Sequence, residues 1–388
     1  MTKKTTEQKS EETKQKNDFD PYAPHKIKWW GWPLLILLIV GTVYIFRTNN
    51  TGQTDNPVAQ PWHESERQMS KGAVFGTFYH ITYQSKVSLQ QGIDSVLQAV
   101  DNSLSPFNEH SVITAINNNT DMSVDPMFEE VFRLSMKVAA ATNGAFDITV
   151  APLVNLWGFG FKNMDNVSDE KVDSLLEYVG LDKIRLVGDK NDTDRVFSYQ
   201  IQKDKPQIML DCSAIAKGYG VDAVGKYFEC LGIENYMVEI GGEVRVRGVN
   251  PQGNLWRIGI NKPQDDLSGT STEIEEILQL TQLSMATSGN YRNFYEKDGK
   301  KYAHTIDPRT GRPVQHSILS STVLAQDCAT ADAFATAFMV LGMERSQKVL
   351  AQHPELMAFF IYTDKDGNIS EWYSEGLKKL IGNHNQHL

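Results

Sequence analysis

An alanine-rich segment near the C-terminal end constrains the fold more than any other part of this chain. Residues 327–339 read Asp-Cys-Ala-Thr-Ala-Asp-Ala-Phe-Ala-Thr-Ala-Phe-Met, with Gly342 after them and a strand-like stretch at 317–325 before them. This order predicts a mostly buried helix that follows a strand. Asp332 and Thr336 are four residues apart, so their oxygens lie on one helical face. A hard cation such as Mg²⁺ would neutralise that carboxylate, but a solvated Asp332 and a Thr336 bonded to its own helix are open alternatives on this segment alone.

Eighteen consecutive uncharged and largely apolar residues at 29–46 predict a transmembrane helix. A cleaved signal peptide would need a small-residue cleavage motif, and a buried core helix would show a polar face. Four lysines lie shortly before this segment and only Arg47 closely follows it, so the N-terminus is expected in the cytoplasm. We therefore expect a cytoplasmic tail at 1–28, a linker at 47–69 and a domain at 70–388. The protein would be a single-pass protein of the cell inner membrane, with this domain on the periplasmic side.

The composition is that of a globular protein and argues against nucleic acid as a partner. The chain has 388 residues, of which 40% are hydrophobic and 22% charged, and its net charge is −10. Residues 1–28 carry seven Lys against five Asp or Glu, so the remainder is still more acidic. Three cysteines without a CxxC pair predict small buried side chains and no redox site.

Strand and helix signals alternate irregularly after Ser70. Strands often follow one another without a helix between them, which favours an α+β fold, a mixed α/β domain, over a doubly wound sheet. The expected strands are 73–83, 208–210, two within 236–247, 256–260 and 317–325, and the expected helices are 89–104, 127–142, 211–230 and 327–339.

Two further segments carry candidate chemistry. Asp211 lies where a strand is expected to lead into a helix, a place that suits an anion or, through turn carbonyls, a cation; it is equally consistent with a simple helix cap. His304 precedes a tight loop with Asp-Pro and Thr-Gly dipeptides. Its imidazole could accept a proton near neutral pH, and a structural turn histidine is the alternative.

Together with segments at 144–160, 239–243 and 287–292, these motifs resemble the ApbE family of FAD:protein FMN transferases over about residues 70–385. The resemblance implies cleavage of the FAD pyrophosphate, transfer of FMN to a Thr or Ser hydroxyl of an exported flavoprotein, and release of AMP. Mg²⁺ would be the cofactor and FAD the substrate. Acceptors would be subunits of respiratory or electron-transfer complexes, such as sodium-pumping NADH:quinone reductase.

The resemblance also implies roles for individual residues. Asp332 and Thr336 would bind the metal through their side chains and Ala214 through its backbone carbonyl, while His304 would be the catalytic base. The implied FAD-binding positions are Phe75, Phe107, Ala145, Phe146, Asp147, Asp211, Ala214 and Ala303.

Two other functions are alternatives, and the first of them uses the same site. A metal-dependent FAD pyrophosphatase would use water in place of the acceptor hydroxyl and give FMN and AMP. A non-enzymatic, membrane-tethered FAD-binding protein would need neither base nor metal, and the presence of Asp332, Thr336 and His304 argues against it.

Overall fold

The computed structural model describes the C-terminal part of the chain from residue 59. The ranges described are 59–159, 167–188, 199–261, 274–289, 294–297, 300–303 and 305–385. The predicted tail, the predicted anchor at 29–46 and His304 lie outside them. In the part of the chain that is described, no helix is long and apolar enough to cross a membrane.

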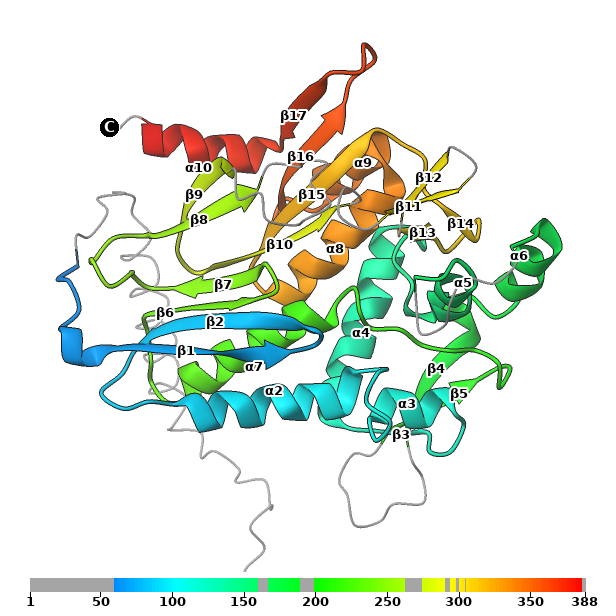
Figure 1. The fold of residues 1–388 in the computed structure, drawn as a ribbon, viewed down its shortest axis with the longest axis horizontal. Helices are drawn as coiled ribbons and strands as arrows, with labels where there is room; N and C mark the ends of the chain where they lie inside the picture. Colours follow the sequence, from blue (N-terminus) through cyan, green and yellow to red (C-terminus); the bar gives the residue numbers. More distant parts are fainter. Residues whose placement is uncertain are drawn as a thin grey trace, which may run out of the picture. The chain divides into compact units, whose positions relative to one another are not determined.

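An eight-stranded antiparallel sheet forms the centre of the domain (Figure 1). In spatial order its strands are β1 (Arg67–Val74), β2 (Thr77–Gln84), β6 (Tyr236–Ile240), β7 (Glu243–Arg247), β10 (Leu283–Gly289), β15 (Ile318–Ala325), β16 (Met357–Thr363) and β17 (Ile369–Tyr373). Every neighbouring pair is antiparallel, so consecutive strands can be joined by short connections. The mixed α and β fold expected from the sequence is confirmed.

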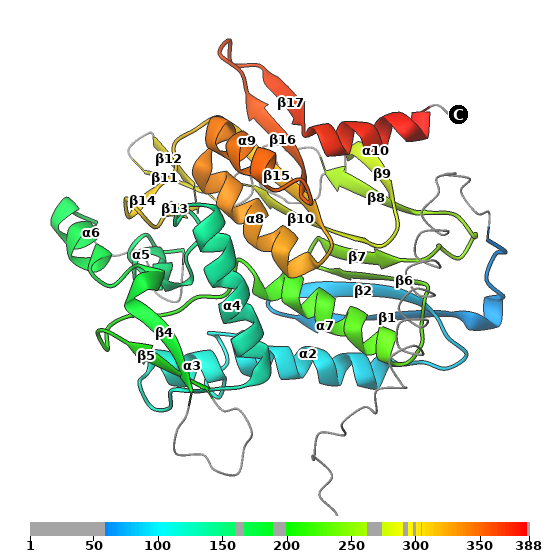
Figure 2. The ribbon, with the colours of Figure 1, turned by 180° about the vertical axis from the view of Figure 1, so that it is seen from behind.

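Helices pack on one face of this sheet. They are α2 (Gln90–Leu104), α4 (Pro126–Ala141), α7 (Ala216–Cys230), α8 (Cys328–Leu341) and α9 (Met343–Gln352). Helix α8 lies on β10 and β15 and also contacts α7 and α4 (Figure 2). Its residues are buried almost all round, as expected for a helix enclosed on every side. The predicted helix at 327–339 is therefore confirmed, with Asp327 as its N-cap.

The other face of the sheet is covered by a hairpin and the last helix. The hairpin consists of β8 (Trp256–Asn261) and β9 (Ile274–Leu280), and the helix is α10 (Glu375–Asn385). A second apolar cluster lies under them and includes Trp62, Trp256 and Leu377. Residues 59–69, expected in the linker, therefore begin the folded domain: Trp62 is buried, and its backbone N–H donates to the carbonyl of Pro251 at 3.0 Å.

The remaining elements flank the main sheet. A three-stranded sheet has the order β3 (Ser123–Val124), β5 (Tyr199–Lys203) and β4 (Ile184–Gly188). The others are α3 (Val112–Asn117), α5 (Ala151–Leu156), α6 (Asp169–Leu176), β11 (Phe294–Lys297), β12 (Lys300–Ala303), β13 (Ile306–Asp307) and β14 (Arg312–Pro313).

Two expectations about strands need correction. The stretch 73–83 is the end of β1, a tight turn and most of β2, and the turn residues Phe75 and Gly76 both have positive φ, 52° and 73°. The expected strand at 208–210 is absent, although these residues are described. The side-chain amide of Asn117 replaces a strand partner: it donates to the carbonyl of Leu210 at 2.9 Å and accepts the N–H of Leu210 at 2.7 Å.

Candidate active site

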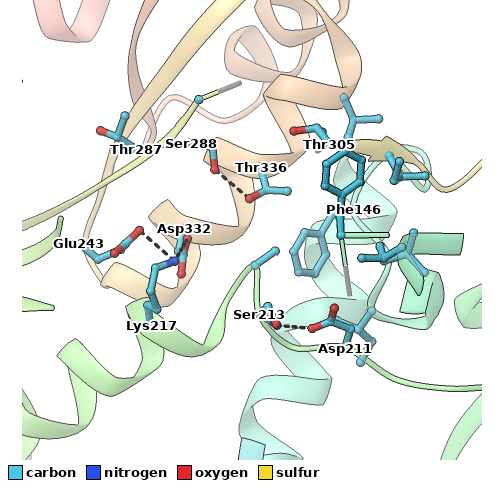
Figure 3. Close-up of a pocket in the computed structure, with 18 of the residues that line it drawn as sticks. Phe146, Asp211, Ser213, Lys217, Glu243, Thr287, Ser288, Thr305, Asp332 and Thr336 are labelled. Atoms are coloured by element: carbon cyan, nitrogen blue, oxygen red, sulfur yellow. Dashed lines mark hydrogen bonds and ion pairs between the residues drawn. The ribbon is translucent and has the colours of Figure 1, made fainter. Parts of the chain in front are cut away.

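A cavity of about 910 Å³ lies beside the beginning of α7 and one face of α8 (Figure 3). This volume is in the range of cavities that bind cofactor-sized ligands. Its walls come from segments far apart in the sequence. The charged and hydroxyl-bearing residues that line it include Asp147, Asp211, Lys217, Glu243, Ser288, Asp332 and Thr336.

The loop before α7 forms one wall. Asp211 accepts the N–H of Ser213 at 2.8 Å, and its own N–H donates to the carbonyl of Ile148 at 2.7 Å. Helix α7 begins at Ala216, later than the expected start at Asp211, because residues 211–215 are held in this turn. Asp211 therefore organises the loop, and both Asp211 and Ala214 line the cavity.

Asp332 meets a lysine and a second carboxylate at the base of the cavity. Asp332 is 2% exposed, and its Oδ2 accepts the N–H of Gly218 at 3.0 Å. The Nζ of Lys217 lies 3.9 Å from Oδ1 of Asp332 and 3.2 Å from Oε1 of Glu243. A solvated Asp332 is thereby ruled out, and its carboxylate is held between α7 and α8.

Burial and charge act in opposite directions on this cluster. Burial raises the pKa of Glu243 to about 8, although Lys217 favours its charged form. Burial alone would lower the pKa of Lys217. The negative charges of Asp332 and Glu243 raise this pKa by more than burial lowers it, so the net shift is upward. Oε2 of Glu243 is buried and has no hydrogen-bond partner among the residues that the structure describes. The base of the cavity thus holds a protonated lysine and an oxygen still able to bond to a ligand.

Thr336 lies one turn after Asp332 on the same face of α8. Its hydroxyl lies 2.9 Å from the hydroxyl of Ser288 on β10, and both residues line the cavity (Figure 3). The predicted juxtaposition of Asp332 and Thr336 is present.

The donors near Asp332 suit a hard cation. Among the described residues, no three His, Cys, Asp or Glu side chains come together as a metal cluster. One buried carboxylate, one hydroxyl and the Ala214 segment of the same cavity wall instead fit Mg²⁺, which typically has one or two carboxylate ligands and completes its shell with waters and substrate phosphates.

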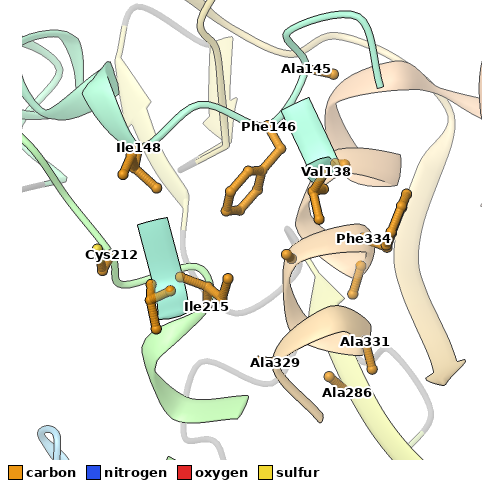
Figure 4. Packing of buried hydrophobic residues seen from close by; sticks show 14 of the residues in the cluster. Val138, Ala145, Phe146, Ile148, Cys212, Ile215, Ala286, Ala329, Ala331 and Phe334 are labelled. Carbon is orange, nitrogen blue, oxygen red and sulfur yellow. The ribbon is translucent and has the colours of Figure 1, made fainter. Parts of the chain in front are cut away.

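Six of the eight expected FAD-binding residues line the cavity, among them Asp211 and Ala214. Phe107, Ala145, Phe146 and Asp147 line the cavity, and Phe107 is 73% exposed. The ring of Phe146 is buried between Ile215 and Val138 (Figure 4).

Asp147 is held rigidly in the cavity wall. Its carboxylate accepts hydrogen bonds from the backbone N–H of Thr149 at 2.7 Å and from the hydroxyl of Thr149 at 2.6 Å. It also accepts one from the N–H of Leu181 at 3.2 Å. Burial raises the pKa of Asp147, which these donors partly offset.

Three expected site residues are not placed in the cavity. Phe75 is not among the described residues that line it; it lies in the β1–β2 turn, and a Cβ on Gly220 would be 2.6 Å from its ring. Ala303 ends β12 opposite Phe294. His304 is outside the described residues, but Thr305, directly after it, lines the cavity.

Lys217, Glu243 and Ser288 were not predicted as site residues. Each belongs to a segment that carried the family resemblance, and Lys217 is a charged residue at the start of a largely apolar helix. That signal could have singled it out, but its contact with Glu243 and Asp332 depends on the tertiary fold.

Comparisons with known proteins identify similar sequences. The sequence model of the ApbE family matches residues 75–360. The FAD:protein FMN transferase of Vibrio cholerae is 37% identical over 328 residues, which cover 82% of this chain and 93% of that protein. The FAD:protein FMN transferase of Escherichia coli K12 is 32% identical over 340 residues, covering 85% and 93%.

Solved structures show the same similarity. The flavin transferase ApbE from Vibrio cholerae superimposes with a TM-score of 0.70 at 35% identity, covering 81% of this chain and 99% of that one. The apo form of Pseudomonas stutzeri flavinyl transferase ApbE gives a TM-score of 0.70 at 29% identity, covering 81% and 97%.

Proposed function

The chain belongs to the ApbE family and is an FAD:protein FMN transferase, and we propose that it transfers FMN to a Thr or Ser hydroxyl in a Mg²⁺-dependent reaction that releases AMP. The observation that carries this proposal is the pairing of buried Asp332 with Thr336 one turn later, both facing one cavity. A non-enzymatic FAD-binding protein is no longer a candidate.

In this proposal Asp332, Thr336 and the carbonyl of Ala214 hold Mg²⁺. When bound, Mg²⁺ would neutralise charge on the phosphoryl oxygens and orient the diphosphate. Lys217 supplies a positive charge at the base of the same cavity. The exposed Phe107 and the wall around Phe146 and Asp147 offer a surface for the rest of FAD.

The reaction is a displacement at phosphorus. The acceptor oxygen forms a bond to the FMN phosphorus, the bond from that phosphorus to the bridging oxygen breaks, and AMP leaves with the bridging oxygen. His304 takes the proton of the acceptor hydroxyl, a role that suits an imidazole near neutral pH. Its neighbour Thr305 lines the cavity, which supports placing the base there.

Intact-mass analysis tests this function directly. The purified full chain is incubated with FAD, Mg²⁺ and a candidate acceptor domain, with an acceptor whose Thr or Ser is replaced by Ala as the control. We expect a gain of one FMN on the unmodified acceptor, AMP in equal amount, and no gain without Mg²⁺. Release of FMN and AMP with no mass gain on any acceptor would instead establish an FAD pyrophosphatase.

We also propose that the acceptors are exported subunits of respiratory or electron-transfer complexes and that 29–46 anchors the enzyme in the inner membrane. The apolar run and the lysines before it support this topology. Protease added to intact spheroplasts should digest the domain. Protection until lysis would contradict the proposed orientation.

A further inference from the structure

Asp222 on α7 is a buried carboxylate that lies outside the cavity. It is 3% exposed, and its oxygens accept the N–H of Cys328 at 3.0 Å and that of Ala329 at 2.8 Å. Nη1 of Arg245 on β7 lies 2.7 Å from Oδ1 of the same carboxylate. Asp222 therefore binds the first two amides of α8 from another helix, more than a hundred positions earlier in the sequence.

Helix α8 also has an N-cap of its own. Asp327 accepts the N–H of Thr330 at 2.8 Å, a local contact that moves with the helix. The first amides of a helix lack partners within it, so both carboxylates satisfy donors that would otherwise be unpaired. They differ in one respect: Asp327 belongs to the chain entering α8, whereas Asp222 ties α8 to a different element.

This contact between α7 and α8 lies one helical turn from the candidate metal site. Gly218 and Asp222 are four residues apart on α7, and both contact α8: Gly218 through Asp332, and Asp222 through the start of the helix. Through its ion pair with Asp222, Arg245 connects β7 to the same contact. Arg245 is two residues from Glu243 and therefore on the same side of that strand. The ion pair thus joins the three elements that carry Lys217, Asp332 and Glu243.

We propose that Asp222 is a positioning residue of the active site: by binding the N-terminus of α8 from α7, it sets where Asp332 lies relative to Lys217 and so determines the affinity for a divalent cation. This inference rests on the metal site of the proposed function. A carboxylate that only capped α8 would affect stability alone, because loss of a cap frays the helix without changing its place.

Mn²⁺ binding measured by electron paramagnetic resonance separates these roles, with the full chain and its Asp222→Asn and Asp327→Ala variants. Loss of an outer contact that orients a metal ligand typically weakens metal binding about 10- to 100-fold. We expect Asp222→Asn to raise the Mn²⁺ dissociation constant by about tenfold or more. Asp327→Ala, the matched control on the same helix end, should lower the melting temperature and leave Mn²⁺ affinity within about twofold of the parent, as expected for a local cap.

Four results would overturn the assignment. Unchanged Mn²⁺ affinity in Asp222→Asn, or an equal loss in both variants, would make Asp222 a stabilising cap only. Failure of the parent to bind Mn²⁺ would overturn the proposed metal site itself. If Asp222→Asn does not fold, Arg245→Lys provides the second variant, because it keeps a positive charge but loses the fork that also contacts Glu229 at 2.8 Å. Arg245→Lys should weaken Mn²⁺ binding in the same direction, and parent-like affinity in a folded Arg245→Lys would contradict the proposal.

Discussion

The backbone N–H of Gly218 donates a 3.0 Å hydrogen bond to Asp332, and a side chain at this position would clash with α8. A Cβ on Gly218 would lie 2.4 Å from the carbonyl oxygen of Cys328 and 2.8 Å from Cβ of Asp332. The first of these atoms is backbone, so α7 and α8 would have to separate. The close approach of the two helices and the position of the candidate metal ligand therefore depend on the same glycine.

Gly218→Ala should destabilise the domain and weaken metal binding together. Overpacking a well-packed interior typically costs about 1–3 kcal/mol. Gly188→Ala is the matched control, since a Cβ at Gly188 would meet nothing within 4 Å. Urea denaturation measures the free energy of unfolding and Mn²⁺ titration the affinity. Parent-like values in Gly218→Ala would show that the two helices can move apart at no cost.

Asp332→Ala should abolish FMN transfer while the domain remains folded. The substitution removes the carboxylate that is expected to bind Mg²⁺, and one hydroxyl and one carbonyl are too few hard ligands to hold the ion with the diphosphate. Thr336→Val should have a milder effect. Transfer rates as a function of Mg²⁺ concentration measure both, and full activity of Asp332→Ala at limiting Mg²⁺ would refute the metal site.

Lys217→Met should weaken FAD binding. Without its ammonium, the diphosphate would face Glu243 and Asp332, which lie 3.2 and 3.9 Å from Nζ in the parent. Hydrogen bonds to charged groups are typically worth about 1.5–3 kcal/mol, so a loss of about 10- to 100-fold in affinity is expected. Flavin fluorescence measures the binding, and Lys217→Arg should restore part of it. Unchanged affinity would mean that the ammonium serves only the two carboxylates.

His304→Ala should leave FAD binding nearly unchanged and slow FMN transfer. Loss of a general base typically costs about 10²- to 10⁴-fold in rate. The parent should show a pH–rate limb near the imidazole pKa that the variant lacks. Equal losses of FAD affinity and rate would make His304 a binding or structural residue.

The free energy of unfolding of the domain should depend on pH through the titration of Asp222. Burial raises the pKa of Asp222 from 3.8 to about 6, although two N–H groups and Arg245 favour its charged form. Between these pH values the folded protein binds a proton that the unfolded chain lacks, so this carboxyl's contribution to the free energy of unfolding falls by about 3 kcal/mol as the pH rises through that range.

Urea denaturation from pH 4 to pH 7 measures this pH dependence of the free energy of unfolding. Asp222→Asn lacks this titration, so the parent's unfolding free energy relative to the variant should decline across the window and level off above it. Parallel pH profiles for the two proteins would contradict the raised pKa.

Local patterns in the sequence predicted the helices α2, α4, α7 and α8 and the strands β6, β7, β8 and β15, but not α9, α10, β10, β16 or β17. Helix α8 shows why: its small apolar residues, its Asp327 cap and Gly342 all lie within one short segment. The position of Asp332 beside Thr336 follows from helical spacing alone. The pattern could not predict the cluster of Lys217, Glu243 and Asp332, because three separate elements bring it together.

The same limit explains the error at 208–210 and the missed role of Asp222. Residues 208–210 have the composition of a strand, but Asn117, ninety-three positions before Leu210, supplies the hydrogen bonds of Leu210. Asp222 has no helix start in its own neighbourhood, so its role as a cap for α8 was invisible in the sequence.

The pairing of Asn117 with Leu210 also bears on how the cavity wall opens. Leu210 directly precedes Asp211, in the segment that leads to Ala214, and its hydrogen bonds go to a single side chain instead of a β-ladder. Loss of the Asn117 contact would therefore free both backbone groups of Leu210 while the central sheet stays intact, with the N–H of Asp211 still bonded to the carbonyl of Ile148. Amide hydrogen exchange at Leu210 would then report a local opening with a free energy below that of global unfolding, and the loop that leads to the candidate metal site would be a separate cooperative unit of the enzyme.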